Sequence, residues 1–585
     1  MGRQRMRRGR MRATCVAVVM VAAMATCASG AQAFDATVEA QNFSKGNERS
    51  TIYNTPEYRL LLTQIGEQNT QAAAAMQAAD PEREFLDHLC TTGGDGCAGD
   101  VRLYDWQSKG YGIVEPVLYT ARSGATISGR VWATKAGPAK RPGIVITNGS
   151  VQANEQLYWF AAQTLAKAGY VVLTYDPQGQ GQSDSPGEGA DQNEGVPAQS
   201  DGRPFYDGPR DALDFFFSTP DHPYEPAKSC STGTSHAAKQ DRRVKARLNT
   251  AFNPFHALLD QSRVGLAGHS FGAAGSSYVA QADPRVKAVV AWDNLGSTDP
   301  ARIQPCPGDP SQRAVPPITK PGLGMSADYG LPPVPNRSDP DPLGKSAESF
   351  LYSGAKVDTG EIIIRGGTHL DFDWIPNMGF PATLRGADEI TWYTTAWFDK
   401  YVKGDPTADQ RLLTDRWRRD TEEGAIDPNG DANMFSFYYR SRLDIGLTNG
   451  SRFKCEDLRP GCAGLSAADG QPADYSYLKN NTTPDGPADA GTATPTGTGI
   501  QGCKAANRTV NVRHKHERIV RAVVYVNGKR VQTTKGKSLK KVVIPPAGNA
   551  RHTVKIVLRS SRGKTYRSVR TYDGCKKTKP RRVKR

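Results

Sequence analysis

Short apolar runs alternate with helical segments through the middle of the chain. Two strands joined by a polar turn are predicted first, at Ile113–Thr120 and Thr126–Ala133. Further apolar runs lie at Gly143–Thr147, Tyr170–Tyr175, Val264–Ala267 and Val286–Trp292, and helical segments at Tyr158–Ala168, Pro209–Phe217 and Phe271–Gln281. Buried apolar strands that alternate with helices are typical of a mostly parallel sheet with helices on both faces. The pattern predicts an α/β domain over residues 111–480.

The segments before and after this domain have different patterns. Pro56–Leu89 is rich in Ala, Gln, Glu and Leu, and it predicts a helix, broken near Pro81, within an N-terminal extension over residues 34–110. Residues 481–500 consist mostly of Thr, Pro, Gly, Ala and Asp, which is typical of a flexible linker.

Residues 501–585 predict a small all-β, sandwich-like module. Ile519–Val526 is rich in β-branched residues and is followed by Asn527-Gly528, a strong hairpin signal. His552–Leu558 alternates between apolar and polar residues, and a turn separates it from another strand at Thr565–Tyr572.

The net charge of +16 over 585 residues is unevenly distributed. Residues 1–33 hold six Arg and no acid, while residues 501–585 hold 26 Lys and Arg against only Glu517 and Asp573. These segments carry +6 and +24, so residues 34–500 carry −14. The basic module could bind an anionic cell-wall polymer, an anionic lipid surface or nucleic acid, or be a solvated accessory domain. Its few aromatic residues argue against specific nucleic-acid recognition.

The N-terminus predicts a secretory signal peptide over residues 1–33. Six Arg precede the apolar stretch Ala13–Cys27, and Ala31-Gln32-Ala33 is a cleavage site before Phe34. An uncleaved anchor helix or a lipid-modified Cys27 is the alternative. We expect a secreted, extracellular or cell-surface protein with no transmembrane domain after cleavage.

Eight cysteines remain after residue 33, and an even number in an exported protein suits disulfides. Eight cysteines allow 105 pairings, so the following pairing is a hypothesis. The proposed pairs are Cys90 with Cys97, Cys455 with Cys462, Cys503 with Cys575, and Cys230 with Cys306. The cysteine and histidine spacing supports no zinc site.

The most specific motif is Gly268-His269-Ser270-Phe271-Gly272. It follows an apolar run and precedes a helix of small residues, as expected of a nucleophile elbow. Glycine is needed on both sides of the serine because side chains would collide in this tight turn. The motif predicts Ser270 as a nucleophile at the N-terminus of a helix, where developing negative charge is favoured.

His369 is the predicted base. Four of the nine histidines precede the elbow, one is His269 itself, and three belong to the β module. In the chain order nucleophile, acid, base, this leaves His369 on the loop Gly366-Gly367-Thr368-His369, which follows an apolar strand. A structural loop histidine is the alternative.

Several aspartates could orient the base. Asp328, at the end of Lys320–Asp328, is the first choice because it ends a strand between the nucleophile and His369. Asp293, after the strand Val289–Trp292, is the main rival. Asp339 and Asp341, in a proline-rich loop, are weaker candidates.

The oxyanion hole is predicted from loop position. The backbone N–H groups of Phe271 and of Ser150, in the loop Asn148-Gly149-Ser150-Val151 after an apolar strand, are the expected donors.

Together these motifs resemble the α/β-hydrolase superfamily over residues 112–403. The Asn-Gly-Ser loop, the turn Asp176–Ser183, the elbow and the Gly-Gly-Thr-His loop occur in the family's order. Gln178 replaces the more usual Arg of that turn, and Asn148 replaces a common His. The gap of 41 residues between Asp328 and His369 is longer than usual. The chain resembles secreted dienelactone-hydrolase-like and cutinase-like esterases, and the resemblance implies ester hydrolysis through an acyl-enzyme with no metal or organic cofactor.

The leading interpretation is a secreted carboxylic-ester hydrolase of the esterase or lipase type, acting on a small-molecule, lipid or polyester substrate. An acyltransferase or peptidase could use the same triad. A cell-surface binding protein acting through the basic module, or a catalytically silent fold, is a further alternative. Four aromatic residues that follow the site loops could line the substrate path or belong to the core: Tyr158, Trp159, Phe372 and Trp374.

Overall fold

A computed structural model describes most of the chain. It covers residues 35, 37, 56–85, 99, 103–104, 106–108, 110–150, 154–299, 304, 306–307, 314–330, 340–374, 384–417, 433–469, 508–512, 517–526, 529–544, 551–573 and 581–582. The chain divides into two compact units, residues 1–492 and 493–585, and each is described by itself.

Some sequence predictions lie outside the described residues. These are the signal peptide over 1–33, the linker over 481–500, Asp339, and the cysteines 90, 97, 503 and 575. Among the helices that are described, none is long and apolar enough to cross a membrane.

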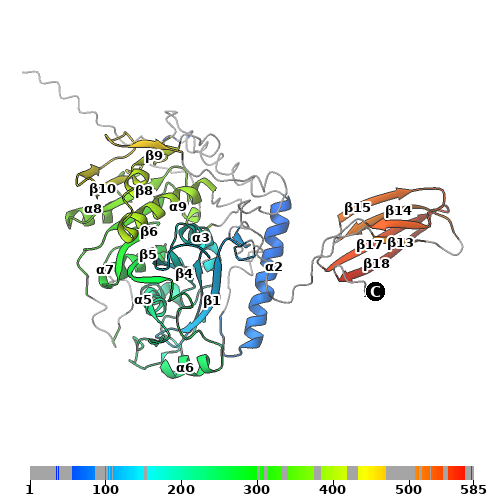
Figure 1. Cartoon of the computed structure of the whole chain (residues 1–585), viewed down its shortest axis with the longest axis horizontal. Coiled ribbons are helices and arrows are strands. Elements are labelled where there is room, and N and C mark those ends of the chain that lie inside the picture. Colours follow the sequence, from blue (N-terminus) through cyan, green and yellow to red (C-terminus); the bar gives the residue numbers. More distant parts are fainter. Residues whose placement is uncertain are drawn as a thin grey trace, which may run out of the picture. The chain divides into compact units, whose positions relative to one another are not determined.

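A ten-stranded sheet forms the centre of the first unit (Figure 1). Its strands, in spatial order, are β1 (Ile113–Thr120), β2 (Thr126–Ala133), β4 (Val171–Tyr175), β3 (Arg141–Thr147), β5 (Leu259–His269), β6 (Val286–Trp292), β7 (Gly322–Ala327), β8 (Thr359–Ile364), β10 (Arg442–Gly446) and β11 (Arg452–Cys455). The six strands from β4 to β8 pair in parallel. At each edge, two further strands pair antiparallel with their neighbours. The predicted, mostly parallel α/β sheet is confirmed.

Helices cover both faces of this sheet (Figure 1). Buried residues of α3 (Trp159–Lys167) and α9 (Leu384–Phe398) belong to one core cluster, and those of α5 (Arg203–Phe217), α7 (Phe271–Ala282) and α8 (Ala347–Gly354) belong to the other. Every residue of β3 and β4 is buried, which explains why these strands are continuous apolar runs in the sequence. Shorter helices are α4 (Ala198–Asp201), α6 (Ala237–Lys245), α10 (Ala408–Leu412), η2 (Glu155–Tyr158), η3 (Gly189–Asp191), η5 (His369–Asp371) and η6 (Asp399–Lys403).

Segments outside the alternating region complete the first unit. The helix α2 (Pro56–Ala79) ends just before Pro81 and buries Leu62 and Ile65 in the core cluster that contains α3. Late in the chain, β10 and β11 extend the sheet beyond β8. A separate pair of parallel strands, β9 (Thr414–Trp417) and β12 (Ser466–Ala468), lies outside the sheet.

Two predicted disulfides are confirmed among the described residues. Cys230 is bonded to Cys306, and Cys455 is bonded to Cys462.

The second unit is an antiparallel β module. A five-stranded sheet contains β15 (Lys529–Lys535), β14 (Ile519–Val526), β17 (Arg551–Ser560), β18 (Thr565–Asp573) and β19 (Arg581–Arg582), and a second sheet pairs β13 (Arg508–Asn511) with β16 (Lys541–Ile544). Residue Val526 lies opposite Lys529, as expected for a tight hairpin at Asn527-Gly528. A small core of valines, Ala522 and Ile556 joins the two sheets, which confirms the predicted β module.

Candidate functional site

The predicted nucleophile lies on a sharp turn between β5 and α7. Ser270 has φ 55° and ψ −120°, a region that side chains rarely adopt, while His269 ends the strand and Phe271 begins the helix. A Cβ atom on Gly268 would lie 2.2 Å from the Gly272 oxygen, and one on Gly272 would lie 2.3 Å from the Asn148 oxygen. The two glycines are therefore required by close backbone contacts, and the turn has the geometry of a nucleophile elbow.

Four loops that end parallel strands meet around this turn. They follow β3, β5, β6 and β8, and they carry Ser150, Ser270, Asp293 and His369 respectively. In open parallel sheets, ligands bind at this carboxyl edge because the loops converge there.

The imidazole of His369 is oriented by Asp293. The Nδ1 atom of His369 forms a short hydrogen bond with Oδ2 of Asp293, and both side chains are less than one-fifth exposed. Burial favours the neutral ring, but the hydrogen bond and charge of Asp293 outweigh burial, and the pKa of His369 is raised. Because Asp293 occupies Nδ1, Nε2 is the nitrogen available for proton transfer.

The ring of His369 lies beside the elbow. Its centroid is 4.5 Å from that of His269, the residue that directly precedes Ser270. The structure thus brings together a serine on a strained turn and a histidine paired with a carboxylate, the combination that activates a hydroxyl nucleophile.

The structure does not pair Asp328, the first choice for the acid, with His369; the carboxylate bonded to His369 is that of Asp293. One oxygen of the fully buried Asp328 carboxylate accepts hydrogen bonds from Arg365 Nη1 at 2.8 Å and from the Gly366 backbone at 2.7 Å. Ser436 donates to the other oxygen. Asp328 therefore holds the chain where it leaves β8, upstream of His369.

The weaker candidate Asp341 also has a local role. Its Oδ1 accepts a hydrogen bond from the Leu343 backbone at 3.0 Å within a turn.

The two predicted oxyanion donors flank Ser270 in different elements. Phe271 is the first residue of α7, and Ser150 follows β3. A Cβ atom on Gly149 would lie 3.2 Å from the Ser270 Cβ atom, so this loop is packed against the elbow. The Oγ atom of Ser150 is buried and has no hydrogen-bond partner within the described part of the chain.

A hydrogen-bond chain connects this loop to the elbow through Tyr158. The Gly149 backbone donates to Tyr158 Oη at 2.9 Å, and Tyr158 Oη lies 2.9 Å from His269 Nδ1. Burial, followed by the charge of His369, holds the pKa of His269 well below its usual range, so its ring is neutral. Tyr158 Oη thus accepts from the Gly149 N–H and is hydrogen-bonded to Nδ1 of the neutral His269 ring.

The four aromatic residues proposed for the substrate side belong to the core instead. Tyr158 and Phe372 are fully buried, and Trp159 and Trp374 expose 7% and 1% of their surface. The alternative interpretation of these residues as core is correct. Phe271, by contrast, is 42% exposed beside Ser270, and its ring stacks on that of Phe205 with centroids 5.3 Å apart. The sequence analysis assigned a role to the backbone N–H of Phe271 but none to its side chain.

Asp373 is a buried carboxyl group beneath the site that the sequence did not reveal. Its Oδ2 lies 4.0 Å from His269 Nδ1, and its Oδ1 has no hydrogen-bond partner among the described residues. Burial raises the pKa of Asp373 to about 8, although the nearby His369 lowers it. Asp373 is therefore mostly protonated at neutral pH.

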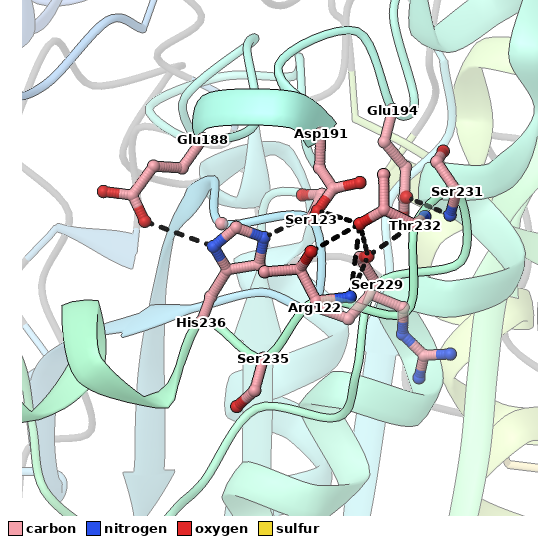
Figure 2. Close-up of polar contacts among 12 residues, drawn as sticks. Arg122, Ser123, Glu188, Asp191, Glu194, Ser229, Ser231, Thr232, Ser235 and His236 are labelled. Carbon is pink, nitrogen blue, oxygen red and sulfur yellow. Dashed lines mark hydrogen bonds and ion pairs between the residues drawn. The ribbon is translucent and has the colours of Figure 1, made fainter. Parts of the chain in front are cut away.

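A second polar cluster contains His236 and does not have the features of a catalytic centre. Figure 2 shows its ring between two carboxylates, with Nδ1 3.2 Å from Glu188 Oε2 and Nε2 3.0 Å from Asp191 Oδ2. Thr232 also donates to Asp191, at 3.0 Å. Since both ring nitrogens are occupied, His236 has none available as a general base. The described residues contain no group of three or more potential ligands that could hold a metal ion.

Comparison with known families agrees with this fold. A family model described as the alpha/beta hydrolase fold matches residues 146–312. The first unit has the α/β-hydrolase fold. The match includes Ser150, Ser270 and Asp293 but ends before His369, and it supports a hydrolase in general terms. No curated protein matches the chain. We call the first unit the hydrolase domain.

Proposed function

We propose that this protein is a secreted serine hydrolase that cleaves carboxylic esters through an acyl-enzyme. The observation that carries the proposal is the pairing of His369 with Asp293 beside Ser270 on its strained turn. The roles are those of a serine triad: Ser270 as nucleophile, His369 as base and Asp293, in place of Asp328, as the orienting acid.

The proposed reaction has two halves. His369 Nε2 accepts the Ser270 proton while Oγ bonds to the ester carbonyl carbon, and the carbonyl oxygen becomes an oxyanion between the Phe271 and Ser150 backbone N–H groups. The imidazolium then protonates the departing alcohol as its bond to carbon breaks, which leaves an acyl-serine. A water molecule, deprotonated by His369, attacks this ester and releases the acid and free Ser270. Asp293 stabilises the imidazolium in both halves.

Hydrolysis of p-nitrophenyl esters from acetyl to palmitoyl tests the proposal. Ser270→Ala should lower kcat by about 10⁴-fold or more relative to the wild-type protein, with the fold unchanged. The chain-length profile of the wild-type protein separates esterase from lipase. Equal activity in both proteins would remove Ser270 from the nucleophile role.

The same acyl-enzyme could transfer its acyl group to an alcohol or arise from a peptide. Adding alcohol acceptors to the ester assay distinguishes these cases, because a transferase forms a new ester where a hydrolase forms acid. An acyl-enzyme that forms from peptides but not from esters would favour a peptidase.

Export is proposed from the sequence of residues 1–33. Expression of the full chain in a secreting host should yield extracellular protein whose N-terminus, measured by mass spectrometry, is Phe34. Protein that retains residues 1–33 in the membrane fraction would indicate an uncleaved anchor instead.

A further inference from the structure

The core cluster of the C-terminal module lies on one face of its five-stranded sheet. The cluster contains Ala522 and Val524 of β14 and Val554 and Ile556 of β17. They pack with Val542 of β16 and with Val512, which directly follows β13. Successive side chains in a strand point to opposite faces. The residues that alternate with these core positions therefore lie on the opposite face.

Cations are aligned in register on that opposite face. Arg521 of β14 lies directly opposite Lys535 of β15 and Arg559 of β17, so three neighbouring strands carry a row of positive charges. Lys555 and Arg567 extend the charged area along β17 and β18, and all of these side chains except the half-buried Arg521 are exposed. We call these five residues the cationic face. Like charges that lie directly opposite one another destabilise a sheet.

The module provides almost nothing to neutralise this charge. Its only acids are Glu517 and Asp573. Glu517 pairs with Lys564 at 3.2 Å, and Asp573 lies opposite Arg551 at the far end of the β17–β18 ladder. The Nε atom of Arg521 is buried and lacks a hydrogen-bond partner among the described residues. The aligned cations repel one another and lower the stability of the module. Binding of an external anion at this face would explain why such a row is present.

The spacing of the charges favours an extended polymer over a small anion. Neighbouring strands are about 4.8 Å apart, and alternate residues along a strand are about 6.7 Å apart, so the cations form a flat grid. Nucleic-acid bases would need aromatic platforms, and the described part of this face offers only Tyr525, which Lys555 contacts at 5.8 Å from its ring centre. A membrane interface would favour exposed Trp, Phe or Leu beside the cations, and the described positions of this face contain none.

We propose that the cationic face binds a flexible, linear, phosphate-bearing polymer that carries no bases, through its charge alone. Binding then releases counterions from the polymer, and affinity falls steeply as salt rises. The proposal is independent of ester hydrolysis. It depends on the proposed export only in that an exported protein would meet such a polymer outside the cell.

The test uses the mature full chain, residues 34–585, with long-chain inorganic polyphosphate as probe between 50 and 200 mM salt. The triple variant R521Q/K535Q/R559Q removes the row of charges. A matched control, K537Q/K540Q/R562Q, removes three exposed cations of the same module that lie elsewhere. We expect the row variant to lose about tenfold or more in affinity and the slope of log affinity against log salt to become shallower by about 2. The control should stay within about threefold of wild type.

Two further measurements separate binding from folding and from catalysis. Because the row is repulsive, its removal should leave the thermal midpoint of the module unchanged or raised, whereas a structural role would lower it. Hydrolysis of a soluble p-nitrophenyl ester should be unchanged in both triple variants, so failure of the ester proposal is detected separately. Equal losses of affinity in both triple variants would overturn the assignment to this face. Tighter binding to phosphatidylglycerol vesicles or duplex DNA than to polyphosphate would overturn the choice of partner.

Discussion

Two aspartates with the same position relative to a strand have different roles because their neighbours differ. Asp293 follows β6 and Asp328 follows β7, and both strands end at the carboxyl edge of the sheet. Asp328 accepts from Arg365 and is removed from any contact with His369, whereas Asp293 binds the imidazole. The sequence restricted the acid to a few residues but could not choose among them, since Arg365 gives no sign in the sequence of which carboxylate it pairs with.

Substitution of each aspartate by asparagine separates the two roles. Asp293→Asn should lower kcat by about 10⁴-fold with a normal fold, because the amide no longer stabilises the imidazolium or fixes its tautomer. Asp328→Asn is the matched control, and it removes the carboxylate charge that faces the buried Arg365 guanidinium. It should lower the free energy of unfolding by about 3 kcal/mol or more and leave kcat of the folded protein near wild type. Steady-state kinetics measures kcat, and urea unfolding measures the free energy of unfolding of each variant. A large loss of kcat in Asp328→Asn but not in Asp293→Asn would indicate that Asp328 is the acid.

The Tyr158 hydroxyl should act as a positioning group. Tyr158→Phe removes the acceptor of the Gly149 N–H and the hydrogen bond to His269, so the loop that carries Ser150 is less firmly held. We expect kcat to fall by about tenfold, with KM changed by less than twofold, because the loop stabilises charge that develops only in the transition state.

The control is Tyr170→Phe, which removes a buried hydroxyl bonded to Asp399, outside the site. It should cost comparable stability and leave kcat unchanged. An equal loss of kcat in both variants would mean that stability, and not loop position, explains the effect.

At the scale of elements, the sequence predicted the type and order of the central strands and helices, although β5 and α5 begin five and six residues earlier than expected. Continuous apolar runs such as β3 and β4 are visible because both of their faces are buried. The extension of the sheet by β10 and β11 was not predicted, since short edge strands pair with residues distant in the sequence and lack a continuous apolar run. The sequence could not decide whether the four aromatic residues after the site loops face the substrate or the core, because an aromatic residue at such a position has the same pattern in both cases.

The contact between α5 and α7 depends on a glycine. A Cβ atom on Gly275 would lie 1.7 Å from the Phe205 backbone oxygen, so the two helices would have to separate. Gly275→Ala should destabilise the hydrolase domain by about 1–3 kcal/mol and lower activity by shifting the elbow. Gly354→Ala, at the end of α8 where the added methyl meets nothing within 4 Å, should be neutral. Urea unfolding checks both, and equal stabilities would show that the helices adjust without cost.

For the whole hydrolase domain, Asp373 predicts a pH dependence of stability. The folded protein holds its proton up to about pH 8, while the unfolded chain, with an ordinary pKa of 3.8, releases it. The unfolded state therefore binds fewer protons between about pH 4 and 8, and stability decreases as pH rises through this window. The contribution is at most about 1.4 kcal/mol per pH unit.

Asp373→Asn should remove this part of the slope. All eight tryptophans precede residue 418, so tryptophan fluorescence during unfolding reports on the hydrolase domain alone. Unfolding measured between pH 5 and 8 should show a flatter profile in the variant. If the free energy of unfolding has the same pH dependence in both proteins, a group other than Asp373 is responsible for it.

The strand β10 pairs with β8 although it lies about 80 residues later in the chain. This pairing limits where the chain can be truncated to obtain the hydrolase domain alone. All proposed site residues lie before residue 370, so a fragment that ends near residue 403 retains the whole reaction centre. Such a fragment would leave the backbone groups of β8 exposed along a new sheet edge, where other molecules can pair and aggregate. It would also lose Arg442, whose guanidinium is fully buried and bonds Ser349 on α8. A soluble catalytic fragment must therefore include β10 and β11, and it is best ended at the boundary between the two compact units, after residue 492.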